Sequence, residues 1–169
     1  MTLGDLYLNQ GQYHEALVVY EKAFATDHLE ISRLLRAIEG FLMFKELDPA
    51  ERLLRKARLL EKEKKFSPQN RAQLRWLEAK QAHLSGKLRT ALKAYRRLLQ
   101  TEPLNGKVLM ALGELYQITG EPDRAIITFE RAARLPDVRV EALIKHAQVE
   151  VERENYRKAI ELLVAAQSL

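Results

Sequence analysis

The sequence predicts an all-α fold built from repeated pairs of antiparallel helices. Its 169 residues include 29 Leu and 20 Ala, which favour helices, but only 12 Gly and Pro together, which interrupt them. A second observation is an alanine that recurs along the chain and is followed four residues later by a large side chain. Positions four apart lie on one face of a helix, so each copy presents the same helix face.

The recurring alanine defines five units of helix–turn–helix. The alanines are Ala16, Ala50, Ala91, Ala125 and Ala159, at spacings of 34, 41, 34 and 34 residues. The large residues four positions later are Tyr20, Leu54, Tyr95, Phe129 and Leu163. The residues twelve positions before each alanine are mostly small: Gly4, Ile38, Ala79, Gly113 and Ala147. We expect the small residues to let two antiparallel helices approach closely while the large ones fill the space between them.

Turn and breaker residues divide these units into ten expected helices. In three units the turn contains a glycine (Gly11, Gly86 or Gly120), which permits the positive φ common at helix C-termini. The second unit has no glycine there, but Asp48 can cap the next helix and Pro49 suits its first turn. The expected helices span 1–10, 13–26, 29–45, 48–65, 68–84, 87–101, 106–119, 122–135, 138–153 and 155–168.

The repeat resembles the tetratricopeptide repeat (TPR), a helix–turn–helix unit of about 34 residues. The fourth unit matches the signature best, at Leu109, Leu112, Gly113, Tyr116, Gly120, Ala125, Phe129 and Ala132. The third and fifth units depart from it, with Glu78 and His146 at positions that are apolar in the signature. The resemblance implies a right-handed α-solenoid of antiparallel helix pairs, formed by a single TPR array over residues 1–169. Its units would span about 1–28, 29–67, 68–105, 106–138 and 139–169, with the first and last incomplete.

The second unit is seven residues longer than its neighbours, and the extra length lies near its C-terminal end. We expect Ser67 to cap, and Pro68 to open, a lengthened following helix. The resulting corner would carry Lys62, Lys64 and Lys65 beside an exposed Phe66.

The ends of the chain form a second departure from the repeat pattern. Solenoid ends usually carry a polar capping helix, and none follows Leu169. We therefore expect either a segment of a longer array or terminal repeats that self-associate.

The residues that most enzymes and metal sites need are missing or scattered. The chain has no Cys, and its four His stand in four different units without a His-x-x-x-His spacing. Its seven Gly form no phosphate-binding run, and no Gly-x-Ser-x-Gly motif occurs. We therefore expect no enzymatic activity, no metal and no cofactor. No apolar run approaches the roughly 20 residues of a transmembrane helix and no signal peptide is visible, which favours a soluble, cytoplasmic protein.

In TPR proteins the first helix of each unit lines a concave groove that holds a peptide or helix. Carried onto this chain, the fifth, ninth and twelfth positions of each unit share one helix face. The candidate groove residues are Leu35, Glu39, Leu42, Trp76, Lys80, His83, Met110, Glu114, Gln117, Ile144 and Gln148. The resemblance thus implies a protein–protein interaction scaffold, with Trp76 as the candidate central anchor. The alternative is that the apolar fifth positions only pack between adjacent helices.

The same positions predict the chemistry of the ligand. The chaperone-binding groove of the family uses Lys at the fifth position and Asn at the ninth, and this chain has neither in any unit. Acidic residues at the ninth position, namely Asp5, Glu39 and Glu114, are opposed only by Lys80. We therefore expect a protein or peptide ligand that has apolar anchors and some basic residues.

Residues 51–100 carry 15 Lys or Arg against four Asp or Glu, a local balance of +11. This excess predicts, as an alternative, a basic surface that binds an acidic partner or nucleic acid. The residues of this basic patch are Arg52, Arg55, Lys56, Arg58, Lys62, Lys64, Lys65, Arg89, Lys93, Arg96 and Arg97. Aromatic residues are sparse in this segment, which argues against nucleic acid.

Overall fold

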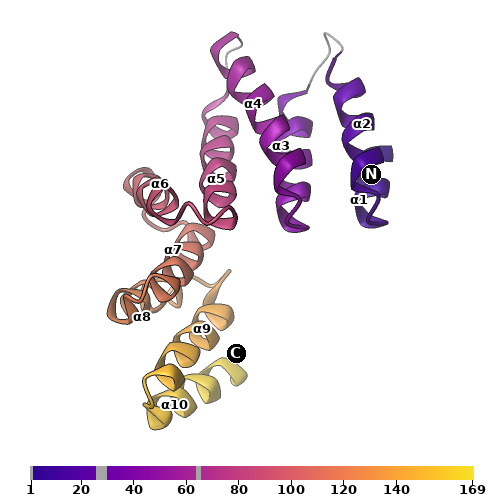
Figure 1. Cartoon of the computed structure of the whole chain (residues 1–169). Helices are drawn as coiled ribbons and strands as arrows, with labels where there is room; N and C mark the ends of the chain where they lie inside the picture. The colour runs from indigo at the N-terminus through magenta and orange to yellow at the C-terminus, as the bar shows by residue number, and fades with distance from the viewer. Residues whose placement is uncertain (1, 26–29, 64–65) are drawn as a thin grey trace. The chain divides into compact units, whose positions relative to one another are not determined.

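The computed structural model describes residues 2–25, 30–63 and 66–169, and these residues form ten α-helices and no strand (Figure 1). Every predicted range overlaps one helix, and each helix end lies within three residues of its predicted position. The predicted all-α fold of helix pairs is therefore confirmed. The helices fall into two compact units, unit 1 over Met1–Lys87 and unit 2 over Leu88–Leu169, which we describe in turn.

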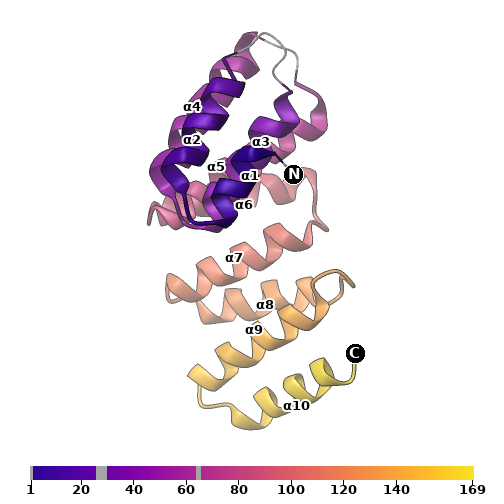
Figure 2. The same ribbon diagram turned by 90° about the vertical axis from the view of Figure 1, so that its right-hand side faces the viewer.

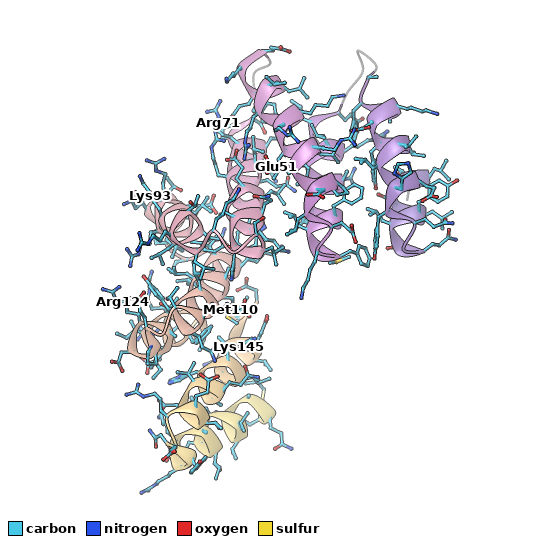
Figure 3. The ribbon with its side chains drawn as sticks, in the orientation of Figure 1. Glu51, Arg71, Lys93, Met110, Arg124 and Lys145 are labelled. Carbon is cyan, nitrogen blue, oxygen red and sulfur yellow. The ribbon has the colours of Figure 1, made fainter. Side chains whose placement is uncertain are left out.

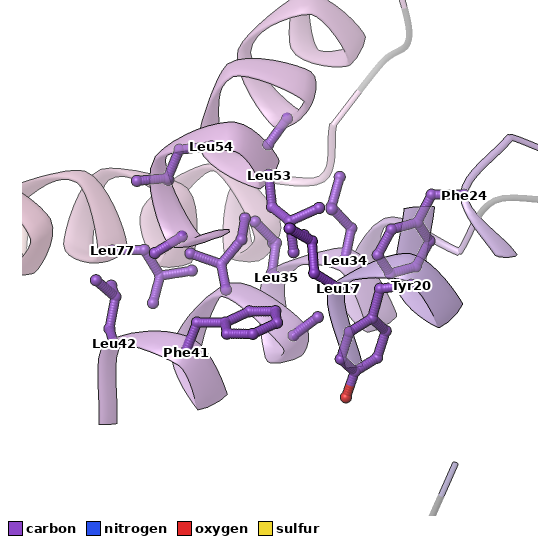
Figure 4. Packing of buried hydrophobic residues seen from close by; sticks show 14 of the residues in the cluster. Leu17, Tyr20, Phe24, Leu34, Leu35, Phe41, Leu42, Leu53, Leu54 and Leu77 are labelled. Atoms are coloured by element: carbon purple, nitrogen blue, oxygen red, sulfur yellow. The ribbon is translucent and has the colours of Figure 1, made fainter. Parts of the chain in front are cut away.

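Unit 1 contains the first five helices. They are α1 (Leu3–Asn9), α2 (Tyr13–Ala23), α3 (Ile31–Met43), α4 (Leu47–Glu63) and α5 (Pro68–Leu84). Helix α1 packs against α2, and α3 packs against α4, α5 and α1. The core between them includes Phe41, Leu53 and Leu77, each no more than 1% exposed (Figure 4). Burying side chains of this size stabilises the unit by about 1.5–3 kcal/mol each.

Unit 2 contains the remaining five helices. They are α6 (Leu88–Thr101), α7 (Gly106–Ile118), α8 (Pro122–Ala132), α9 (Arg139–Glu152) and α10 (Tyr156–Gln167). Figure 2 shows α7 to α10 as successive layers, and each of these helices packs against the next. The unit boundary at Lys87 falls inside the predicted repeat 68–105, so a single array over 1–169 stays a prediction.

Glycine and aromatic side chains set the spacing between paired helices in both units. A Cβ atom on Gly4 would come within 2.6 Å of the ring of Tyr20, and one on Gly113 would overlap the ring of Phe129. Each glycine therefore lets the aromatic ring of the partner helix lie directly on its backbone. This confirms the expected contact between a small and a large residue for these two helix pairs.

The turn inside each helix pair has the same backbone geometry in all five repeats. One residue has a positive φ, and these residues are Gly11, Lys45, Gly86, Gly120 and Glu154. The residue that follows donates its N–H to the carbonyl five residues before it, as Lys87 does to Ala82 at 2.9 Å. This bond is the mark of a Schellman motif, which satisfies a free carbonyl at the helix end. Lys45 and Glu154 thus adopt a conformation that the sequence predicted only for the glycines.

The longer second repeat lengthens both helices that meet at its corner. Helices α4 and α5 each contain 17 residues. The Oγ atom of Ser67 accepts the N–H of Asn70 at 3.1 Å, and Pro68 is the first residue of α5, as predicted. The expected exposure of Phe66 is wrong, because this ring is 3% exposed and packs in the core of unit 1. Of the lysines expected beside it, Lys64 and Lys65 lie outside the described residues.

Glu78 and His146, which depart from the TPR signature, are each paired with other polar side chains. Glu78 lies 2.7 Å from Arg58 of α4 and 3.0 Å from Arg75 of its own helix. The buried His146 ring lies 3.3 Å from a carboxylate oxygen of Glu150, and Asn155 donates to the other oxygen at 3.0 Å. Pairing offsets the desolvation of these groups, so both helices keep their register.

Candidate functional site

In unit 1 the predicted groove residues divide between the core and the surface. Leu35 and Leu42 are 0% and 1% exposed and belong to the hydrophobic core, so a ligand does not reach them. Their assignment to the groove is corrected here, and the physical reason is that α3 is covered by α4, α5 and α1. Leu35, a fifth position, packs between helices as the alternative describes, and Leu42, a twelfth position, is buried in the same core.

The other predicted groove residues of unit 1 are partly exposed. They are Glu39 on α3 and Trp76, Lys80 and His83 on α5. Helices α3 and α5 pack against each other, and Trp76 also packs against the core. The core contact holds the indole in place while part of its surface stays accessible, which suits an anchor for an apolar side chain.

In unit 2 the predicted groove residues lie on α7 and α9. Two of those on α7 each contact a polar side chain of α9. A Glu114 carboxylate oxygen lies 3.0 Å from the Lys145 ammonium, and the Gln117 amide donates to Glu152 at 2.6 Å. Lys145 neutralises Glu114, so the negative charge expected at this position is compensated. Sequence reasoning missed Lys145 and Glu152, although each lies about one repeat length from its partner.

Asp5, the third acidic residue expected in the groove, is used inside unit 1. It accepts hydrogen bonds from the Thr2 backbone N–H at 2.7 Å and from the Tyr20 hydroxyl at 2.5 Å. Burial opposes its ionisation, but the hydrogen bonds from Thr2 and Tyr20 outweigh that effect and hold the pKa of Asp5 below its usual value. The pKa of Tyr20 moves in the opposite direction: burial and the Asp5 carboxylate raise it.

The fifth repeat position differs between α7 and α9. Met110 of α7 is 6% exposed, so its place in the groove is corrected to packing, whereas Ile144 of α9 is 37% exposed. Ile144 lines a largely apolar pocket of about 460 Å³ on α9 and α10, together with Gln148, Val151 and Leu163. Phe129, which holds in its repeat the position of Leu163, is fully buried, whereas Leu163 is 45% exposed. Unit 2 therefore presents an accessible apolar surface here, which we call the α9 pocket.

The basic patch is divided between the two units, and part of it is paired internally. Arg52 lies 2.9 Å from Glu21, and Arg58 lies between Glu51 and Glu78. The Lys56 ammonium donates to the backbone carbonyl of Phe24. These contacts use three of the cations that sequence reasoning assigned to a ligand, while Arg55 and Lys62 are exposed on α4. Lys64 and Lys65 lie outside the described residues.

The patch residues of unit 2 all lie on α6. Arg89, Lys93, Arg96 and Arg97 are exposed, and this helix contains no acidic residue. Figure 3 shows Lys93 and Arg124 on the side of unit 2 formed by α6 and α8, and Met110 on the side formed by α7. Two further cations on α8, Arg124 and Arg131, were missed because the charge count ended at residue 100.

Other kinds of site are not found in the part of the chain that the structure describes. No group of three or more His, Cys, Asp or Glu side chains there is placed to hold a metal ion. Among the same residues, no helix combines the length and the apolar character needed to cross a membrane.

Comparisons with known proteins identify the repeat. Models of the tetratricopeptide repeat match residues 1–27 and 85–138. A comparison with curated proteins gives no match in sequence. Among solved structures, MamA 41-end from Desulfovibrio magneticus RS-1 is 14% identical with a TM-score of 0.73, over 99% of this chain and 90% of that one.

Two further structures show the same fold. A crystal structure of MamA is 18% identical with a TM-score of 0.72, and the match covers 99% of this chain and 94% of that chain. YrrB, described as a TPR protein with an unusual peptide-binding site, is 17% identical with a TM-score of 0.63. That match covers 96% of this chain and 80% of YrrB. At these identities the likeness establishes an all-α helical-repeat fold.

Proposed function

This chain is a tetratricopeptide-repeat protein, and on this premise we propose that it serves as a non-catalytic scaffold that binds a peptide or helix of a partner protein. The observation that carries the proposal is the α9 pocket, an open apolar surface on a first helix, where the family places its ligands. An accessible apolar surface of this kind is typical of a binding site. The peptide-binding site named for YrrB, which has the same fold, agrees with this proposal.

The expected ligand is a short segment with at least one large apolar side chain. Ile144, Val151 and Leu163 supply an apolar lining, and Gln148 offers an amide that can bond to a peptide backbone. Because Lys145 compensates Glu114 at 3.0 Å, the ligand needs fewer basic residues than the sequence suggested. In unit 1 the partly exposed Trp76 stays a predicted anchor.

Selection from a displayed random-peptide library on the whole chain tests this proposal. The affinity of an enriched peptide is then measured by fluorescence anisotropy for the wild type and for Ile144→Asp. We expect the variant to weaken binding by about tenfold or more, because a charge replaces an apolar contact. The matched control is Leu59→Asp, at an exposed leucine of α4 outside the pocket. Equal affinities for Ile144→Asp and the wild type would contradict the proposal.

A second candidate function is self-assembly through the terminal repeats. Leu3 and Leu6 of α1 are 55% and 39% exposed, whereas Leu112 and Leu115, at the same repeat positions in α7, are 4% and 0% exposed. At the other end of the chain Leu163 is exposed, whereas Phe129, at the same repeat position, is buried. Both terminal repeats therefore expose apolar side chains at positions that are covered in an inner repeat.

A further inference from the structure

A second pocket of unit 2 lies among α6, α7 and α8, on a different set of residues from the α9 pocket. It has a volume of about 360 Å³, and three arginines line it: Arg96 from α6 and Arg124 and Arg131 from α8. Its lining contains no Asp or Glu. We call it the arginine cleft.

The ring of Tyr116 organises two of these arginines. The guanidinium carbons of Arg96 and Arg124 lie 5.6 and 5.8 Å from the centre of this ring. The Arg96 Nε also donates to the Tyr116 hydroxyl at 3.0 Å. Such cation–π contacts and the hydrogen bond hold two like charges at fixed places around one aromatic side chain.

All three guanidinium groups keep donors for a ligand. Arg124 donates to Glu121, the residue that precedes α8, and Arg131 donates to the backbone carbonyl of Pro103 at 3.3 Å. Each guanidinium has five N–H donors in a planar fork, so these bonds and the Tyr116 bond use only part of them. Three arginines and one contacting carboxylate leave the cleft with an excess of positive charge.

The cleft also has an apolar part beside these charges. Leu99 and Ile127 line it, and Ile127 is 59% exposed. An inorganic anion would leave this apolar surface uncovered. A ligand that carries both an anionic group and an apolar side chain would use the whole surface.

We propose that the arginine cleft binds an acidic segment of a partner protein in which carboxylates flank an apolar side chain. Planar guanidinium groups bind carboxylates through paired hydrogen bonds, and Ile127 would contact the apolar residue between them. Nucleic acid fits less well, because Tyr116 is only 7% exposed and two guanidinium groups lie over its ring, so no base can stack on it. The site is separate from the proposed groove and does not depend on it.

Fluorescence anisotropy with a labelled peptide of alternating Glu and Leu tests the proposal on the whole chain. The double variant Arg124→Gln/Arg131→Gln should lose about tenfold or more of the affinity, since two charge-assisted hydrogen-bonding groups are removed. The matched control is Arg134→Gln/Arg157→Gln, which removes the same charge from arginines that do not line the cleft. It should bind within about twofold of the wild type. Circular dichroism checks that both double variants remain helical.

Three comparisons separate this proposal from its alternatives. A peptide with Gln in place of Glu should not bind, and equal binding of that peptide would overturn the role of the arginines. Equal losses in the two double variants would show attraction by net charge alone and would also overturn the proposal. A single-stranded oligonucleotide of equal charge that binds more tightly than the Glu–Leu peptide would also overturn the proposal.

The apolar part of the cleft has its own test. Ile127→Ser should lower the affinity for the Glu–Leu peptide several-fold and leave the affinity for a Glu–Ser peptide unchanged. Equal affinities of the Glu–Leu peptide for Ile127→Ser and wild type would overturn the apolar contact. Because Ile144 lines the α9 pocket and not the arginine cleft, Ile144→Asp should leave this peptide bound, which separates failure here from failure of the proposed function.

Discussion

Lys45 and Glu154 occupy a backbone region that disfavours side chains. Their φ angles are 62° and 61°, where the other three turns have glycine. A side chain in this region costs roughly 1–2 kcal/mol, whereas glycine loses roughly 0.5–1 kcal/mol more conformational entropy on folding. We therefore expect Lys45→Gly to raise the free energy of unfolding by about 0.5 kcal/mol, measured by urea denaturation.

The reverse change at another turn provides the matched control. A Cβ atom on Gly120 would meet nothing within 4 Å, so Gly120→Ala creates no steric overlap. At its φ of 73° the same balance of strain and entropy should lower the free energy of unfolding by about 0.5 kcal/mol. An unchanged stability in this variant would contradict the backbone argument for both residues.

The hydrogen-bonded Asp5 makes stability depend on pH. Its folded pKa lies below the unfolded value of 3.8, so the ionised form stabilises the fold. This contribution is complete above 3.8 and is lost as the pH falls through the folded pKa. We expect Asp5→Asn to destabilise the protein at neutral pH and to approach the wild type in acid. Urea denaturation at several pH values measures this difference, and a constant difference would contradict the assignment.

Within α9 a polar cluster replaces part of the apolar face. His146 and Glu150 are 3% and 7% exposed, and Asn155 bonds to the same carboxylate. Removing the carboxylate leaves the buried His146 ring without this polar partner, so Glu150→Ala should lower the free energy of unfolding by about 2 kcal/mol. Glu141→Ala, at an exposed position of the same helix, should change it by less than about 0.5 kcal/mol. Thermal or urea unfolding measures both changes. Similar losses of unfolding free energy in the two variants would show that the cluster adds no stability.

The helices were predictable from the sequence because the signals that define them are local. Caps, breakers and the spacing of Ala125 and Phe129 depend on residues within one repeat. The candidate site was harder, because it depends on contacts between repeats. The position of Leu35 resembles a groove position within its own helix, yet neighbouring helices bury it completely. The partners of Glu114 and Tyr116 lie on adjacent helices, and no single-helix pattern identifies Lys145 or Arg124 as those partners.

At the scale of the whole molecule, the exposed leucines of both terminal repeats predict association. Contact between unlike ends of two copies leaves one end of each copy free, so further copies can add to form a ring or a longer chain. We expect the mass in solution to rise over about a tenfold range of concentration, measured by light scattering after size exclusion. Leu6→Glu or Leu163→Glu should reduce this rise, and Leu59→Glu should not. A wild-type monomer at every concentration would contradict self-assembly and leave the α9 pocket open for a peptide.

The contact between Gly113 and Phe129 also has a consequence for how such a chain can diverge. A larger residue at 113 displaces the ring, and a smaller residue at 129 leaves a void, so either change alone passes through a less stable protein. The second repeat holds a different solution at these positions, Ile38 with Leu54, and both side chains are fully buried. Going from one solution to the other requires two substitutions, 16 residues apart in the chain. We therefore expect the residues at 113 and 129 to change together during evolution, and not one at a time.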